Sequence, residues 1–161
     1  MNTDVVKLVI FRHGADLFGA DIFSVERVLR HEAASVVPDL PEWIVGVLEH
    51  RGTVMPVVDM RRRLGLPAGA PGPETRTMVL ATETGWIGAE VDAVLEVANV
   101  PAEGMTAPPQ LFRGLAAEFV RGIAKVGGRL VVVLEMERVL TSADRIAFER
   151  ALEAEVAASR G

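Results

Sequence analysis

Short apolar runs, separated by glycine and proline turns, fill most of the chain. The runs Val5–Phe11 and Leu130–Leu134 are rich in valine and have the length of β-strands, and the pair Gly127-Gly128 marks a hairpin turn before the second of them. Such patterns predict about nine or ten short strands. Predicted strands do not alternate with predicted helices along the chain, which argues against a parallel α/β sheet. The hydropathy pattern therefore predicts a mainly β protein, and it leaves open whether the strands close one large barrel or two small ones.

The middle of the chain places a single charged residue between two strand-like runs. Residues 43–50 and Thr53–Asp59 are mostly apolar, and Arg51-Gly52 lies between them. Proline cannot donate a ladder hydrogen bond, so Pro56 inside the second run predicts an edge strand or a bulge. Arginine ringed by aliphatic residues is typical of contact surfaces between proteins, which makes Arg51 a candidate binding residue.

Local signals also predict two helices and one less regular strand. Asp59 can cap a short helix that Gly65 ends. In Val25–Arg30 apolar and polar residues alternate imperfectly, but we predict a strand there. The tail at 142–160 is rich in alanine, glutamate and arginine, and Thr141 with Asp144 matches a capping box. We predict a C-terminal helix that packs along the body or onto a partner, through a narrow apolar stripe of Phe148, Leu152 and Val156.

Composition restricts the classes of chemistry open to the chain. Its 161 residues include no cysteine, which rules out disulfides, thiolate catalysis and thiolate metal sites. Half of the residues are apolar, yet no apolar run approaches the ~18 residues of a membrane span, and the N-terminus has no signal-peptide character. We therefore expect a cytoplasmic protein without direct membrane insertion. The net charge is −5, and most of the charge of the one dense basic cluster, Arg61–Arg63, is expected to be solvated, so nucleic-acid binding is not expected.

Candidate catalytic groups are few and scattered. His13, His31 and His50 stand outside any metal-binding or catalytic spacing and are predicted to be surface or turn residues. Asp59 and Asp92 each follow an apolar run and could form a general acid/base pair, but a helix cap and a turn between strands are simpler interpretations. We predict no catalytic residue, no metal ligand and no cofactor. The alternative is a β-barrel enzyme built on Asp59, Asp92 and His50, or a small-ligand-binding protein with an unrecognised site.

Two sequence blocks carry a resemblance to a known family. The first, G-V-x-x-x-R-G-x-V-x-P-V-V-D-x-R, covers residues 46–61, and the second combines I-G, V-D and a valine-rich segment within residues 87–97. With these blocks in this order, the chain resembles the CheW family of bacterial chemotaxis coupling proteins over residues 5–140. The resemblance implies two SH3-like five-stranded β-barrels packed on a shared apolar core, with the chain crossing between them. It also implies that a CheW-like domain of two intertwined subdomains at 5–140 is followed by a C-terminal α-helix at 142–160.

The function that the resemblance implies is that of a non-enzymatic adaptor. Such a protein links the cytoplasmic tip of a methyl-accepting chemoreceptor to a CheA-type histidine kinase, in the cytoplasm at membrane receptor arrays. The kinase carries a regulatory domain of the same fold, so a relative of that domain is a further alternative. The family's partner site lies in an apolar groove between the barrels, and its positions in this sequence are Val25, Arg27, Gly46, Arg51, Val94 and Val97.

Three expectations concern individual site residues. Arg51 could clamp a partner carboxylate, or it could hold the barrel junction together through backbone carbonyls. Side chains of a regular strand alternate between its faces, so Val94 and Val97 are expected on opposite faces, with one of them buried. Arg27 stands where the family commonly has Glu, which predicts a cognate receptor with a compensating acid. A second departure from the family pattern is Glu49-His50, where the family commonly has Asn-Leu.

Overall fold

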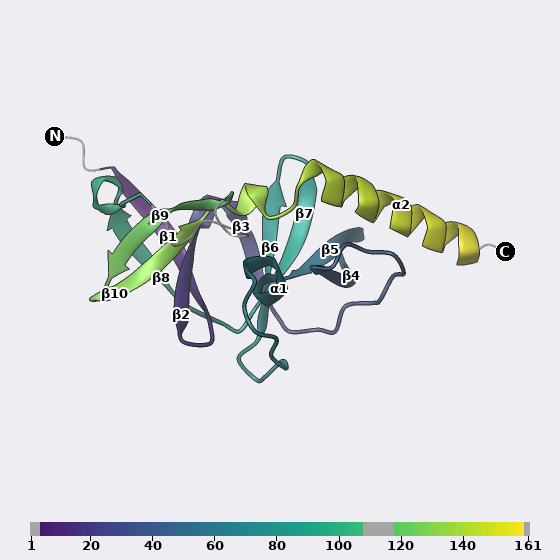
Figure 1. Cartoon of the computed structure of the whole chain (residues 1–161), viewed down its shortest axis with the longest axis horizontal. Coiled ribbons are helices and arrows are strands. Elements are labelled where there is room, and N and C mark those ends of the chain that lie inside the picture. The colour runs from purple at the N-terminus through teal and green to yellow at the C-terminus, as the bar shows by residue number, and fades with distance from the viewer. Residues whose placement is uncertain (1–3, 108–117, 160–161) are drawn as a thin grey trace.

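The computed structural model describes residues 4–107 and 118–159, whose strands form two five-stranded sheets (Figure 1). The first sheet has the order β8-β1-β2-β10-β9, and all its neighbours are antiparallel except β2 and β10. Its two outer strands, β8 and β9, contact each other and close it into a barrel. The strands are β1 (Val5–His13), β2 (Asp16–Asp21), β8 (Ala93–Pro101), β9 (Val120–Val126) and β10 (Arg129–Leu134).

The second sheet is built from one continuous stretch of chain. The chain enters it through the short helix η1 (Ile22–Ser24) and returns to the first sheet at Asp92. Both ends of the domain therefore complete the first barrel, and the chain crosses between barrels twice. This confirms the mainly β fold with two SH3-like subdomains and a C-terminal helix. The strand order is β3-β6-β7-β5-β4, formed by β3 (Val25–Arg30), β4 (Ile44–His50), β5 (Thr53–Asp59), β6 (Arg76–Thr82) and β7 (Gly85–Val91).

Strand β1 joins the two barrels because it is buried on both faces. Leu8 and Ile10 point into the core of the first barrel, whereas Val9 and Phe11 belong to a larger cluster shared with the second sheet. Full burial of such side chains stabilises a fold by about 1.5–3 kcal/mol each. The predicted shared apolar core is thus confirmed, and from the second sheet it receives Ile44, Val58, Met78, Leu80, Ile87, Ala89 and Val91.

The short helix α1 (Met60–Leu64) begins and ends where the sequence predicts. Asp59 accepts a hydrogen bond from the backbone N–H of Arg61 (2.9 Å). Gly65 ends the helix with φ 71°, a conformation that costs glycine little. Asp59 therefore has the capping role that its position suggested.

One arginine of α1, Arg63, is an exception to the expectation that most of the charge of this cluster is solvated. Arg63 is buried; its Nε donates to the Val139 carbonyl (2.7 Å), and its guanidinium packs on the rings of Trp43 and Phe119. Three consecutive helical residues point about 100° apart, so one of them must face the body when the helix lies against it. Arg63 thereby joins α1 to the segment that leads into the C-terminal helix.

Pro56 does not mark an edge strand. Strand β5 lies inside the sheet between β7 and β4, and Pro56 pairs with Val47 of β4. The parallel ladder with β7 starts only at Val57. At Pro56 the strand is therefore paired on one side, so the missing N–H costs no hydrogen bond to β7.

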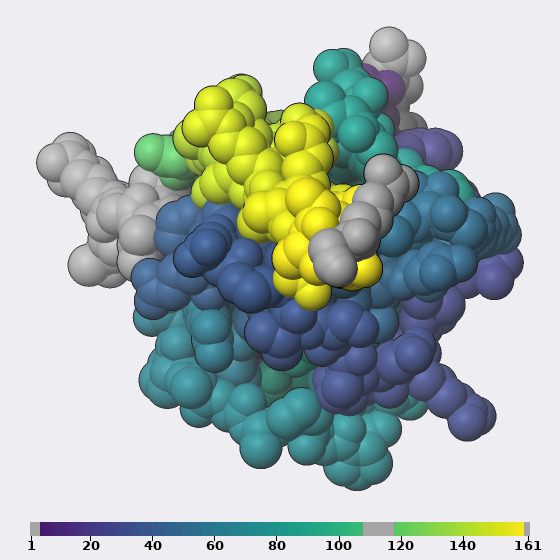
Figure 2. Space-filling view, turned by 90° about the vertical axis from the view of Figure 1, so that its right-hand side faces the viewer, coloured from purple at the N-terminus to yellow at the C-terminus, as the bar shows by residue number. Residues whose placement is uncertain are grey.

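The C-terminal helix α2 (Ser142–Ser159) packs along the body of the protein. Its start is a reciprocal cap, as predicted, because the Thr141 N–H donates to Asp144 Oδ2 (2.9 Å) and the Asp144 N–H donates to Thr141 Oγ1 (3.1 Å). Phe148 is buried in the shared core, whereas Val156 is 44% exposed. Figure 2 shows the helix lying across the blue surface of the second barrel. Only the first part of the predicted apolar stripe is therefore used for packing, and position 160 lies outside the described residues.

Candidate partner-binding surface

Arg51 lies at the tip of the hairpin between β4 and β5. Arg51 and Gly52 both have positive φ, 48° and 78°, as in the tight turns that suit the twist of a β-hairpin. The Arg51 side chain is 53% exposed, and its Nη1 lies 3.2 Å from Oε1 of Glu26 on β3. This contact joins two strands of the second sheet. The expectation that Arg51 holds the barrel junction through backbone carbonyls is therefore not met; its guanidinium pairs with a carboxylate within one barrel.

Strand β3 carries two of the predicted residues on opposite faces. Val25 pairs with Leu80 and Arg27 with Val79, so the ladder shifts by one residue at Glu26. Paired residues of neighbouring strands point to the same face, and Leu80 and Val79 point to opposite ones. Val25 accordingly packs against the shared core, while Arg27 is exposed and has no ion pair within the described ranges.

Gly46 has a packing reason to be glycine. It is buried, and its neighbour Val47 forms a two-way backbone bridge with Ser35. A Cβ at position 46 would collide with the Ser35 carbonyl oxygen and would lie 2.9 Å from the Cβ of Ala34. The glycine lets the segment before β4 lie directly on the strand. A part for Gly46 in partner binding stays a prediction.

The expectation for Val94 and Val97 is wrong because β8 contains a bulge. Val97 pairs with Val9 and Val94 with Phe11, so Leu95 is inserted between them. Val9 and Phe11 both face the shared core, and their partners therefore lie on that same face of the sheet. Neither valine is fully buried: Val94 is half-buried against the shared core, and Val97 is 55% exposed.

The structure therefore divides the six predicted residues into two groups. Val25, Val94 and Val97 belong to the faces that carry the shared core, and Arg27, Gly46 and Arg51 belong to the second barrel alone. An apolar groove of about 310 Å³ lies between strands β2 and β10 of the first barrel and the segment of α1, but none of the six residues lines it; its walls are Leu17, Phe18, Leu64, Leu66, Leu130, Val132 and Leu134, together with Asp16.

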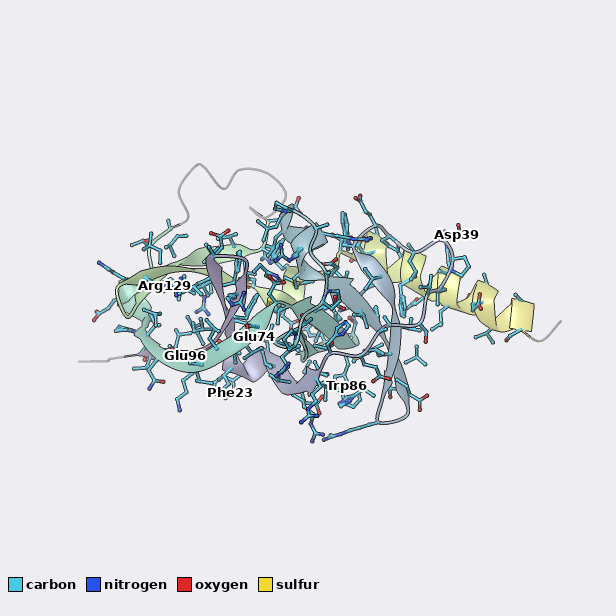
Figure 3. All side chains as sticks on the ribbon, turned by 90° about the horizontal axis from the view of Figure 1, so that it is seen from below. Phe23, Asp39, Glu74, Trp86, Glu96 and Arg129 are labelled. Atoms are coloured by element: carbon cyan, nitrogen blue, oxygen red, sulfur yellow. The ribbon has the colours of Figure 1, made fainter. Side chains whose placement is uncertain are left out.

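One exposed aromatic residue was missed from the sequence. Phe23 lies on η1, where the chain passes from the first barrel to the second, and its side chain is 90% exposed (Figure 3). In the sequence it follows Ile22 and precedes Ser24 and Val25, so it looks like part of a strand. The available signal was Asp21, whose carboxylate accepts a hydrogen bond from the Phe23 N–H (2.9 Å) and turns the chain outward.

The candidate acid Asp92 stabilises the junction between the barrels. Its carboxylate accepts hydrogen bonds from Arg61, whose Nε is 2.8 Å away, and from the N–H of Gly14 (2.9 Å). Burial opposes ionisation of this carboxyl, but these hydrogen bonds and the nearby charges outweigh it and lower its pKa to about 2. Asp92 stays ionised and paired near neutral pH, so it is unsuited to exchange protons in catalysis.

Two of the three histidines are buried, against expectation. His13 is 2% exposed between the rings of Phe11 and Phe18, and burial lowers its pKa below 6.5 although Asp92 opposes the shift. His50 is 7% exposed and packs edge-on against Trp86. Rings on other strands, Phe18 of β2 for His13 and Trp86 of β7 for His50, pack against them, which an isolated sequence position does not reveal.

Two coupled barrels, in which the candidate acids Asp59 and Asp92 serve as a cap and an ion pair and Phe23 is exposed on the crossing segment, are the architecture of a scaffold protein that works through contact surfaces. Comparison with known proteins gives the same class. The model of the CheW-like domain matches residues 7–144. The chemotaxis protein CheW of Rhizobium meliloti (strain 1021) is 29% identical over 86% of this chain and 90% of its own length. Protein FrzA of Myxococcus xanthus is 32% identical over 87% of this chain and 88% of its own.

A solved structure agrees with these sequence matches. The scaffolding protein TtCheW from Thermoanaerobacter tengcongensis superposes with a TM-score of 0.79 at 26% identity, covering 89% of this chain and 92% of that one. The chain belongs to the CheW-like domain family. It is a scaffolding protein of chemotaxis signalling and not an enzyme. None of the helices in the described ranges combines the length and apolar character that a membrane crossing requires.

Proposed function

We propose that this protein links the cytoplasmic helical tip of a methyl-accepting chemoreceptor to a CheA-type histidine kinase, in the cytoplasm at receptor arrays. The observation that carries the proposal is the exposure of two apolar side chains, Phe23 on the segment that crosses between the barrels and Val97 on β8. Exposed aromatic and aliphatic side chains are typical of surfaces that a partner covers. An amphipathic helix can bury such residues through anchors at helical spacing.

The proposal is tested by co-sedimentation of the purified protein with receptor-containing membranes and kinase. Val97→Asp places a charge on the apolar surface, and we expect it to weaken association with the receptor about tenfold or more. Val36→Asp is the matched control, since Val36 is an 81% exposed valine on the loop before β4. Wild-type protein that sediments with neither partner would refute the proposal, as would equal binding by both variants.

Arg27 supports a proposal about which receptor is recognised. Its guanidinium is exposed and has no ion pair in the described part of the chain, whereas the neighbouring Glu26 is already paired with Arg51. A free cation here favours a receptor with an acidic residue opposite it. We expect Arg27→Glu to weaken binding to the cognate receptor and to strengthen binding to receptors that carry a basic residue there. Unchanged affinity for both would contradict this assignment.

We also propose that residues 5–140 form the binding domain and that the helix at 142–160 is a separate stabilising element. The family match ends at residue 144, within the first turn of α2, which supports the division. Because Phe148 packs into the shared core, truncation after Leu140 should lower the unfolding temperature. At a temperature where the truncated protein is still folded, we expect it to bind its partners. Loss of binding under those conditions would show that α2 itself contacts a partner.

A further inference from the structure

His50 is a buried histidine with an unused nitrogen. Its Nε2 has no hydrogen-bond partner and lies 4.0 Å from Oε2 of Glu26. The other side of the ring packs against Trp86, which Figure 3 marks in the second barrel. A buried polar atom without a partner is costly, and protonation would turn this one into a charged donor that faces a carboxylate.

The Glu26 carboxylate is shared between two possible cations. Its Oε1 is 3.2 Å from Arg51 Nη1, and its Oε2 faces His50. Of the other neighbours of His50, β7 contributes the uncharged Trp86 and β5 the paired Thr53, whereas Glu49 precedes His50 on the opposite face of β4. One carboxylate balances one cation, so the cluster is neutral while His50 is neutral and carries one positive charge when His50 is protonated.

We propose that Glu26, His50 and Arg51 form a proton-linked site for an acidic side chain of the partner; this rests on the proposed function and on the sequence prediction that Arg51 is a contact residue. With His50 neutral, the Glu26 carboxylate balances the Arg51 guanidinium. With His50 protonated, Glu26 is divided between two cations, and Arg51 presents a net positive charge to an incoming carboxylate. Histidine is the side chain suited to this change near physiological pH. By linkage, binding of the acidic partner promotes protonation of His50.

The binding test compares the affinity of the full-length protein for a purified chemoreceptor cytoplasmic fragment at about pH 6 and about pH 8, at constant ionic strength. For the wild type we expect binding about fivefold tighter at the lower pH, the effect of one unit charge a few ångströms from a carboxylate in a largely aqueous setting. His50→Leu should remove the difference. His31→Asn is the matched control, because His31 pairs with Glu90 elsewhere in the same barrel and should leave the difference intact.

A measurement without the partner separates this inference from the proposed function. The NMR signal of the Arg51 side-chain Nε–H should shift between about pH 8 and pH 6 in the wild type and in His31→Asn, and stay constant in His50→Leu. An Arg51 signal that ignores pH in the wild type, or that responds equally in His50→Leu, overturns the inference. If the signal behaves as expected but the fragment binds at neither pH, the proposed function fails and the proton-linked cluster stands.

Discussion

Replacing Asp92 with asparagine tests how the two barrels are held together. The aspartate lies between β7 and β8, where the chain returns to the first barrel, and it receives hydrogen bonds from Arg61 of α1 and from the N–H of Gly14 at the β1–β2 turn. Asparagine keeps the size of the side chain and one acceptor oxygen but removes the negative charge. Arg61 then loses its ion pair and one of its two acceptor oxygens at position 92, and it keeps its contact with the Pro67 carbonyl.

The size of the effect follows from the pKa of Asp92. A carboxyl whose pKa falls from 3.8 to about 2 on folding stabilises the protein by roughly 2 kcal/mol at neutral pH. Because the side chain is 23% exposed and partly screened by solvent, we expect a loss of about 1–2 kcal/mol in Asp92→Asn. For a protein of this length that corresponds to a decrease of about 2–8 °C in Tm.

The sign of the pH dependence is also defined. The pKa of Asp92 is lower in the folded state than in the unfolded state. Its contribution to the free energy of unfolding is therefore complete above the unfolded-state pKa near 4 and is lost as the pH falls to about 2. The pKa of His13 is lowered in the folded state, mainly by burial. Protonation of His13 in the unfolded state therefore lowers the free energy of unfolding already at a higher pH, and it does so in both the wild type and Asp92→Asn. The two proteins should therefore differ most at neutral pH and converge below pH 4.

The assay is urea unfolding followed by circular dichroism at several pH values. Glu74→Gln is the matched control, because Glu74 pairs with Arg12 in the same region but its side chain is 68% exposed. We expect the control to cost less than about 0.5 kcal/mol. Equal stability of Asp92→Asn and wild type at neutral pH, or a difference that persists unchanged at about pH 2, would refute the assigned role of the ion pair.

Three further variants test the packing around the second barrel. Gly46→Ala should lower the free energy of unfolding by about 2 kcal/mol because its Cβ meets the Ser35 carbonyl, and normal stability would contradict that contact. Phe148→Ala should cost about 3 kcal/mol, and the control Val156→Ala, on the exposed end of α2, less than about 1 kcal/mol; similar losses would show that the helix is not anchored at Phe148. Arg63→Met should cost at least about 1 kcal/mol, measured by thermal unfolding, because it leaves the Val139 carbonyl without its buried donor.

The features that could be predicted from sequence depend on residues close together in the chain. The Asp59 cap, the Thr141–Asp144 capping box and the Gly127-Gly128 turn are each fixed within a few residues, and the structure contains all three. The number of strands follows from the same local periods. The division into two barrels did not follow from periodicity, because it depends on which distant strands pair; the family resemblance supplied it.

The features that could not be predicted depend on pairing between strands. The bulge at Leu95 puts Val94 and Val97 on one face, and the shift at Glu26 puts Val25 and Arg27 on opposite faces. Both reverse an inference from simple alternation, because one inserted residue changes the face of every residue beyond it. The partner of Arg51 was hidden for the same reason, since Glu26 reaches it only through closure of the second barrel.

The shared core explains how a protein without a reaction can still couple its partners. Val9 and Phe11 of the first barrel pack in one cluster with side chains of the second, and the Asp92–Arg61 pair closes the junction beside it. A close-packed core moves little, so Val97 on one barrel and Arg51 on the other are held at a fixed separation. A partner that fits both surfaces gains their contributions without the entropy cost of aligning two independent modules. Changes that loosen the junction should therefore weaken partner binding even when the contact residues are intact.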